Sequence, residues 1–133
     1  MTPARPTWQI PTGAVNDFVE WALGFQTLHV GKQRFAYPRG SSEDAAAWRP
    51  QRDYVADAQH LPAMLEWLQA RGLLQIQQHA SGRAWSVAFQ WFDQDRFRAI
   101  GIVHDGTMWG AIAAIVAEVG SCERNAPGAT VTR

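Results

Sequence analysis

Residues 84–91 read AWSVAFQW and alternate between large apolar and small or polar side chains more cleanly than any other stretch of the chain. An extended strand directs successive side chains to opposite faces, so one face of this strand collects four large apolar residues. They are Trp85, Val87, Phe89 and Trp91. Residues 93–95 (DQD) can turn the chain into a returning strand over 96–103, and residues 73–79 precede as a third strand, with a turn at 80–82. The stretch therefore predicts a three-stranded antiparallel meander.

Three segments carry apolar residues at the 3.6-residue spacing of amphipathic helices. They lie within residues 12–24, 57–72 and 105–120, and each is bounded by residues suited to start or end a helix. The starts are Thr12, either Asp57 or, because of the early Pro62, His60, and either Asp105 or Thr107; the ends are Gly24, Gly72 and Gly120. Asp17 and Glu20 stand in the first half of the first helix, where the helix dipole favours acidic side chains. Because three such helices can cover one face of a three-stranded sheet, the predicted fold class is α+β, a small antiparallel sheet packed with about three amphipathic helices.

Between the first two helices the sequence predicts a short hairpin followed by a long loop. Residues 25–30 (FQTLHV) and 33–37 (QRFAY) are rich in strand-forming residues, and Gly31-Lys32 can turn the chain between them. Residues 38–51, rich in glycine, serine, proline and charge, form the longest predicted loop. The predicted organisation is an extended arm over residues 1–12, one domain over 13–120 and a flexible tail over 121–133.

The composition is that of a folded and weakly charged chain. The 133 residues are 47% hydrophobic and 18% charged, and 12 basic side chains balance 12 acidic ones. This balance argues against a general nucleic-acid binder, whose affinity rests on many phosphate contacts. The single cysteine, Cys122, excludes an intrachain disulfide. No stretch approaches the roughly 20 apolar residues that span a bilayer. We see no signal-peptide pattern in residues 1–11 and expect a cytoplasmic protein without a membrane partner.

Basic and aromatic side chains gather in and around the long loop and form the candidate binding site. Seven of them are Arg34, Tyr37, Arg39, Trp48, Arg49, Arg52 and Tyr54. Guanidinium groups clamp phosphates and carboxylates, and aromatic rings stack on bases. The set fits a nucleotide-sized anion or an acidic protein surface, and the alternative is a solvated loop whose tryptophan folds back onto the core. Arg98 extends the surface if its face of the sheet is open, and otherwise pairs with a neighbour such as Glu66 or Asp95.

The chain carries no recognisable catalytic signature. His104-Asp105 is the most suggestive pair, but adjacent residues of an extended chain point in opposite directions. Asp93 and Asp95 could hold a divalent cation, although a solvated turn accounts for both. Ser86 has no evident base, and the one cysteine lies in the predicted tail. We therefore expect no enzymatic activity, no metal and no cofactor.

The order of elements resembles the phage ABA-sandwich domain, found in small phage and prophage proteins. The resemblance covers roughly residues 13–120. It rests on residues 15–25 (VNDFVEWALGF), 52–57 (RDYVAD) leading into 61–68 (LPAMLEWL), 85–89 (WSVAF) with 97–100 (FRAI), and 109–116 (WGAIAAIV). The last helix follows His104-Asp105-Gly106-Thr107 here, whereas the family often has a short polar loop with proline at this place.

The resemblance brings no catalytic residues with it. It implies a phage or prophage accessory protein in the cytoplasm of a bacterial host. Our first hypothesis is a non-catalytic protein that inhibits a host protein or complex, such as a defence system, through a flat or convex patch. The alternative is a protein that sequesters a nucleotide-like small ligand in a pocket or in the cleft of a homodimer. A small hydrolase is a third hypothesis, and it would need converging titratable groups.

Overall fold

The computed structural model describes residues 12–40, 47–79 and 84–124, which form three α-helices and six β-strands. The helices are α1 (Val15–Ala22), α2 (Leu61–Gln69) and α3 (Met108–Arg124). The strands are β1 (Phe25–Val30), β2 (Gln33–Pro38), β3 (Arg49–Pro50), β4 (Gly72–Gln78), β5 (Ala84–Asp93) and β6 (Arg96–Asp105). They build two antiparallel three-stranded sheets, β1-β2-β3 and β4-β5-β6, so the predicted α+β class is confirmed.

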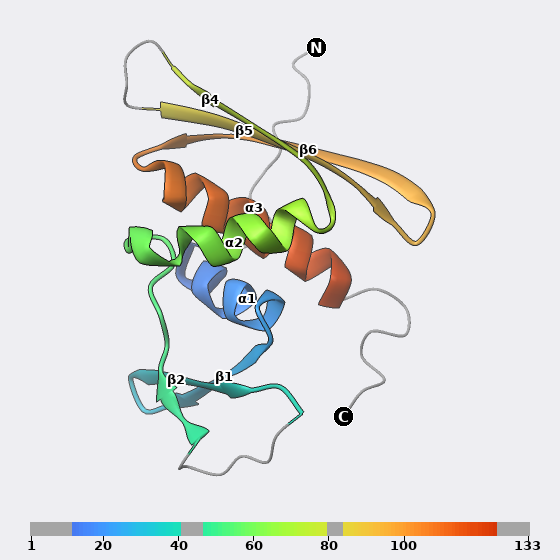
Figure 1. Ribbon diagram of the computed structural model, residues 1–133. Coiled ribbons are helices and arrows are strands. Elements are labelled where there is room, and N and C mark those ends of the chain that lie inside the picture. The colour runs from blue at the N-terminus through green and yellow to red at the C-terminus, as the bar shows by residue number, and fades with distance from the viewer. Residues whose placement is uncertain (1–11, 41–46, 80–83, 125–133) are drawn as a thin grey trace, which may run out of the picture.

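The helices lie between the two sheets, which occupy opposite ends of the molecule (Figure 1). α3 packs against β5 and β6 on one side and against α1 on the other, and α2 lies beside α3. α3 is buried from Gly110 to Gly120, which makes it the centre of the core. The first hairpin thus does not extend the large sheet, and it stands as a separate small sheet beyond α1.

The meander predicted from residues 84–91 is the large sheet. Each strand of its central hairpin runs two residues further than predicted, β5 to Asp93 and β6 to Asp105. The four residues expected on the covered face do pack into the core. Val87, Phe89 and Trp91 are buried, and Trp85 packs against them partly exposed. The period-2 pattern therefore identified both the strand and its buried face.

A tight turn joins β5 to β6, and it holds two residues in the left-handed region. Gln94 has φ 50° and Asp95 has φ 67°, the pattern of a type I′ turn, which favours asparagine and then glycine. A glutamine at this position is strained because its Cβ approaches the backbone.

We expect the double variant Gln94→Asn/Asp95→Gly to be more stable than the wild type by about 1 kcal/mol. Urea unfolding followed by far-UV circular dichroism measures the difference. An unchanged or lower unfolding midpoint would show that the turn costs the fold nothing.

Gly120 does not end α3, contrary to the sequence prediction. A Cβ added there would lie 3.2 Å from the Cβ of Ala22 and 3.4 Å from the carbonyl oxygen of Phe18, both on α1. The glycine therefore permits the close approach of two helices, and α3 continues to Arg124. Residues 121–124 of the predicted tail are helical, and residues 125–133 lie outside the described residues.

The predicted long loop contains a short third strand of the small sheet. Arg49 pairs with Ala36 and Pro50 with Phe35, and the backbone N–H of Gln51 donates to the carbonyl of Arg34 at 3.0 Å. Two residues carry no periodicity, so sequence pattern could not reveal β3. Residues 41–46 of the same loop lie outside the described residues.

Two of the predicted helix boundaries are confirmed, since Thr107 Oγ1 accepts the backbone N–H of Gly110 at 3.0 Å and Gly24 has φ 101° after α1. Asp57 accepts the backbone N–H of Gln59 at 3.0 Å, but it caps a 3-10 turn over Ala58–His60, and the N-cap position of α2 is His60, the alternative start. Gly72 does not end α2, which stops at Gln69, and instead begins β4. The cap of α1 is wrong, because its N-cap position is Ala14 and a 3-10 turn over Thr12–Ala14 precedes it. Residues 1–11 of the predicted arm are not among the described residues. Within the described chain, no helix is both long enough and apolar enough to cross a membrane.

Candidate functional site

The predicted basic and aromatic cluster surrounds a buried carboxylate, that of Glu20 on α1. Arg49 donates to both of its oxygens, at 2.7 Å to Oε1 and 2.8 Å to Oε2. The hydroxyl of Tyr54 donates to Oε1 at 2.5 Å, and the backbone N–H of Arg52 donates to Oε2 at 3.1 Å. Glu20 and Tyr54 are fully buried, so this network replaces the water that a carboxylate otherwise requires.

Burial and this hydrogen bond change the acidity of Tyr54. Desolvation first, and then the hydrogen bond to Glu20, raises the pKa of Tyr54 from 10.0 to about 12. A tyrosine of the unfolded chain ionises near its ordinary pKa, so the unfolded form gains from ionisation at a pH where the folded form does not. The stability that Tyr54 contributes is therefore present below pH 10 and is lost as the pH rises from 10 to about 12.

We expect the free energy of unfolding to fall by up to about 1.4 kcal/mol per pH unit through this window because of Tyr54. Urea titrations across pH 9 to 12 measure the slope, and Tyr54→Phe is the control that should flatten it. Equal slopes for the two proteins would refute the role given to this hydroxyl.

A second acidic group of α1, Asp17, holds the outer part of the small sheet. Gln51 Nε2 donates to Asp17 Oδ1 at 2.5 Å, and His29 Nε2 lies 3.5 Å from Asp17 Oδ2. Arg34 Nη1 lies 3.8 Å from Asp17 Oδ1 and donates to the carbonyl of Gly13 at 2.6 Å. Asp17 and Glu20 thus fasten the small sheet to α1 from one side of the helix.

The remaining predicted residues also contact the protein itself. The guanidinium of Arg39 lies 4.2 Å from the ring centroid of Trp21, and those of Arg49 and Arg52 lie 4.4 and 5.8 Å from that of Phe25. Tyr37 is buried. The rings of Trp48 and Phe35 are 5.7 Å apart, so this tryptophan does fold back onto the sheet.

Arg98 is not brought together with the other seven residues, because it lies on the large sheet. It pairs with Asp93 at 3.1 Å rather than with Glu66 or Asp95, and it stands 5.9 Å from the ring of Trp91. Seven of the eight predicted residues therefore do cluster, but the contacts described above run to α1, to Phe25 and Phe35 of the small sheet and to each other. The missing signal was the i, i+3 spacing of Asp17 and Glu20, which places two acidic groups on one side of a helix.

The uncovered face of the large sheet is a surface that the sequence analysis did not single out. Figure 1 shows the helices on the opposite side of this sheet. We define the open face by its outward strand positions, deduced from the pairing register. They are Leu73, Gln75, Gln77, Ala84, Ser86, Ala88, Gln90, Phe92, Phe97, Ala99, Gly101, Val103 and Asp105. Asp105, at the end of β6, is the one charged residue at these positions, and no Lys or Arg stands among them.

Four large apolar side chains of the open face are strongly exposed. Phe92 is 73% exposed, Leu73 70%, and Phe97 and Val103 61% each. The rings of Phe92 and Phe97 contact edge to face, with centroids 5.7 Å apart, beside the β5–β6 turn. Ala88, Gly101 and Ala99 are small, and Gln75 and Gln90 stand beside them in the middle of the face. The result is a partly apolar surface with one charged strand position, Asp105.

Ser86 has a base within reach, which the sequence did not reveal. Its Oγ lies 2.7 Å from His79 Nε2, at one end of the open face. A nucleophilic serine also needs a third group to orient the histidine and donors for the oxyanion. No ion pair of His79 with a carboxylate is found among the described residues, and the pair is exposed. A cross-strand hydrogen bond is therefore sufficient to explain it.

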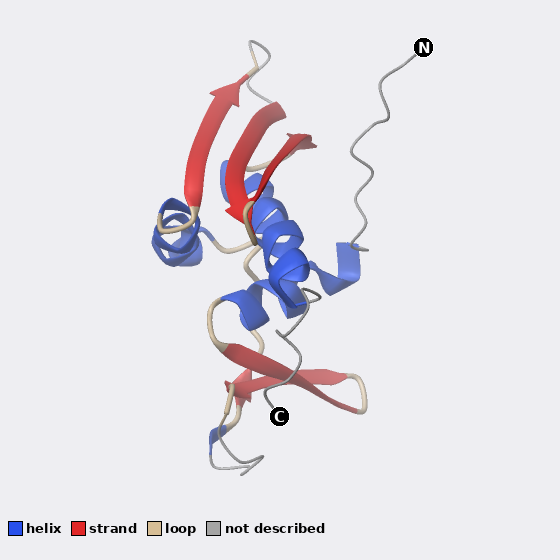
Figure 2. Cartoon of the chain, turned by 90° about the vertical axis from the view of Figure 1, so that its right-hand side faces the viewer, coloured by secondary structure: helices blue, strands red, loops and turns tan. Residues whose placement is uncertain are grey.

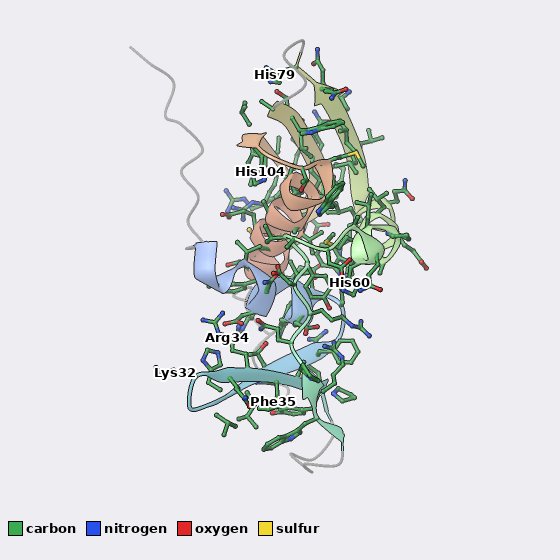
Figure 3. The ribbon with its side chains drawn as sticks, turned by 90° about the vertical axis from the view of Figure 1, so that its left-hand side faces the viewer. Lys32, Arg34, Phe35, His60, His79 and His104 are labelled. Atoms are coloured by element: carbon green, nitrogen blue, oxygen red, sulfur yellow. The ribbon has the colours of Figure 1, made fainter. Side chains whose placement is uncertain are left out.

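The histidines do not come together in one site. Figure 3 shows His60, His79 and His104 at separate places along the molecule. His104 packs against the start of α3, where a Cβ on Gly110 would lie 2.7 Å from its Nε2. Throughout residues 12–40, 47–79 and 84–124, no group of three metal-binding side chains is found.

Comparison of the chain with models of protein families, with curated proteins and with solved structures finds no match. The resemblance to the phage ABA-sandwich domain therefore stays an expectation from the sequence.

Proposed function

We propose that this chain is a non-catalytic binding protein that docks onto another protein through the open face of sheet β4-β5-β6. The observation that carries the proposal is the combination of four strongly exposed apolar side chains with a single charged residue, Asp105 at the end of β6, among the strand positions of that face. Charged residues are depleted, and aromatic residues enriched, at the centres of protein interfaces.

The chemistry of the open face suits a protein better than a small anion. A nucleotide needs positive charge and a concave site, and no Lys or Arg stands at the strand positions of the open face. The arginines that could bind an anion contact Glu20, Asp17 and aromatic rings of the chain itself. Exposed apolar surface gains free energy when another protein covers it, at roughly 25 cal/mol per Å².

The biological role proposed for this binding is inhibition. A protein that covers a partner's surface needs no cofactor and no reactive group. With the sequence resemblance, we propose a phage or prophage accessory protein that inhibits a host protein or complex in the bacterial cytoplasm. The lack of Lys and Arg at the strand positions of the open face supports inhibition by occlusion over sequestration of an anionic ligand.

We expect Ala88→Arg to reduce partner binding at least tenfold while the fold persists. Ala88 is on the central strand β5, between Gln75 and Gly101, and its side chain points outward. An arginine there places a charge in the middle of an interface that offers it no partner. The matched control is Ala63→Arg on the exposed side of α2.

The measurement is affinity purification from bacterial cells with the wild type and both variants, quantified by mass spectrometry. The proposal predicts a protein that the wild type and Ala63→Arg retain and Ala88→Arg loses. Full retention by Ala88→Arg would contradict the proposal, and a co-purifying nucleotide-sized mass would favour sequestration instead.

A further inference from the structure

Strand β4 is an edge strand without the features that usually protect an edge. Within the described chain it pairs only with β5, and Figure 2 shows it on the outside of the sheet. Natural edge strands carry charges, proline or bulges that prevent pairing with another chain. β4 reads GLLQIQQ over residues 72–78, and its register with β5 is unbroken. Its backbone is therefore available to a further strand.

The opposite edge of the sheet is protected. β6 carries Arg96 and Arg98 in its first half, both exposed. If two copies of β6 paired about a two-fold axis, the arginines of each copy would lie beside the strand of the other copy, and two sets of like charges would come together. Two copies of β4 bring no charge at all into the pair, so of the two edges of this sheet the β4 edge is better suited to self-association.

We infer that β4 pairs with β4 of a second copy of this chain, antiparallel and about a two-fold axis at Gln75. This register pairs the whole strand and places Gln75 opposite Gln75 of the second copy. Leu74 then faces Ile76 of the second copy on the helix-covered side of the sheet. Ile76 pairs with buried Val87 on that side but is itself 37% exposed, and this contact would cover it.

The area of the open face supports the same assembly, and this step rests on the proposed function. Three strands about 4.8 Å apart and about 30 Å long present roughly 430 Å². A standard protein interface buries about 800 Å² on each partner. A two-fold axis perpendicular to the sheet keeps both open faces on one side, so the dimer presents one continuous six-stranded face of roughly 860 Å².

Sedimentation velocity of the full chain tests the dimer. We expect the wild type to sediment as a dimer at micromolar concentrations, and Gln75→Lys to weaken dimerisation at least tenfold because two lysines would meet at the axis. Val103→Lys, on β6 and on the same face, is the control that should remain dimeric. Circular dichroism confirms that each variant is folded.

A monomeric wild type would overturn the inference, and so would a dimer that Val103→Lys dissociates and Gln75→Lys does not. A monomer would leave the test of the proposed function with Ala88→Arg unaffected. Dissociation of the dimer by Val103→Lys would instead show that the open faces of two copies contact each other. This result would contradict the proposed function as well.

A disulfide cross-link tests the register. In a Cys122→Ser background, Gln75→Cys is expected to form an interchain disulfide on mild oxidation, because opposite residues of an antiparallel pair lie about 4.5–5.5 Å apart. Gln77→Cys points to the same face but would stand about 14 Å from its copy, beyond the reach of a disulfide. Cross-linking through Gln77→Cys alone would overturn the proposed axis.

Discussion

Replacing Glu20 by alanine is expected to lower the free energy of unfolding by about 3 kcal/mol or more. The Arg49 side chain is only 24% exposed, and the substitution leaves its guanidinium without the carboxylate that it binds. It also removes the acceptor of the buried Tyr54 hydroxyl. Loss of one partner of a buried ion pair typically costs about 3–5 kcal/mol, because the remaining charge has neither water nor a counter-ion. Urea unfolding at neutral pH measures the loss.

The control for this prediction is Glu66→Ala, an acidic residue on the exposed side of α2. Surface substitutions of this kind stay within about 0.5 kcal/mol. A double-mutant cycle with Arg49→Ala isolates the pair, and its coupling should exceed about 1 kcal/mol. Additive losses would show that Glu20 and Arg49 do not support each other.

The result bears on function as well as on stability. If Glu20 holds Arg49, Tyr54 and the backbone of Arg52, then the basic and aromatic cluster is part of the joint between the small sheet and α1. A variant with an unchanged unfolding midpoint would mean that these side chains are free to serve a ligand. The prediction therefore separates the structural interpretation of the cluster from the ligand-binding hypothesis.

Replacing Gly72 by alanine is expected to cost about 3 kcal/mol or to prevent folding. Gly72 begins β4 opposite Trp91, and a Cβ there would lie 2.0 Å from the carbonyl oxygen of Gln90 and 3.0 Å from the Cβ of Trp91. The carbonyl belongs to the backbone of the central strand, so no side-chain rotation relieves the contact. Overpacking of a core costs about 1–3 kcal/mol even where side chains can adjust.

The matched control is Gly101→Ala in the same sheet. A Cβ at Gly101 would meet only the carbonyl oxygen of Val87, at 4.0 Å. We expect this variant to stay within about 0.5 kcal/mol of the wild type. Soluble yield and urea midpoints of the two variants give the comparison, and equal stability would show that β4 can move away from β5 without cost.

The fold was largely predictable because the residues that the sequence spaces at strand or helix periodicity are the ones that face the core. The alternation over residues 84–91 identified β5, and the apolar spacing identified all three helices. Glycine was ambiguous, because Gly24 ends a helix whereas Gly120 permits contact between two helices. Only the packing of α1 on α3 decides between these roles.

The sequence predicted which basic and aromatic residues lie close together, but not that their side chains contact the chain itself. Clustering of Arg34, Arg49 and Tyr54 follows from their proximity in the chain, whereas their contacts follow from where α1 lies. An acidic residue near a helix start satisfies the helix dipole, and this local explanation concealed the tertiary role of Glu20. The open face was missed for the opposite reason, since apolar, small and glutamine residues in alternation carry no chemical signature.

Photo-cross-linking in cells tests the central claim most directly. Phe97 on the open face and Arg39 in the basic cluster are each replaced by p-benzoylphenylalanine, and the cross-linked products are identified by mass spectrometry. We expect a partner protein joined to position 97 and none joined to position 39. A partner joined only through position 39 would place the binding surface on the small sheet and refute binding through the open face.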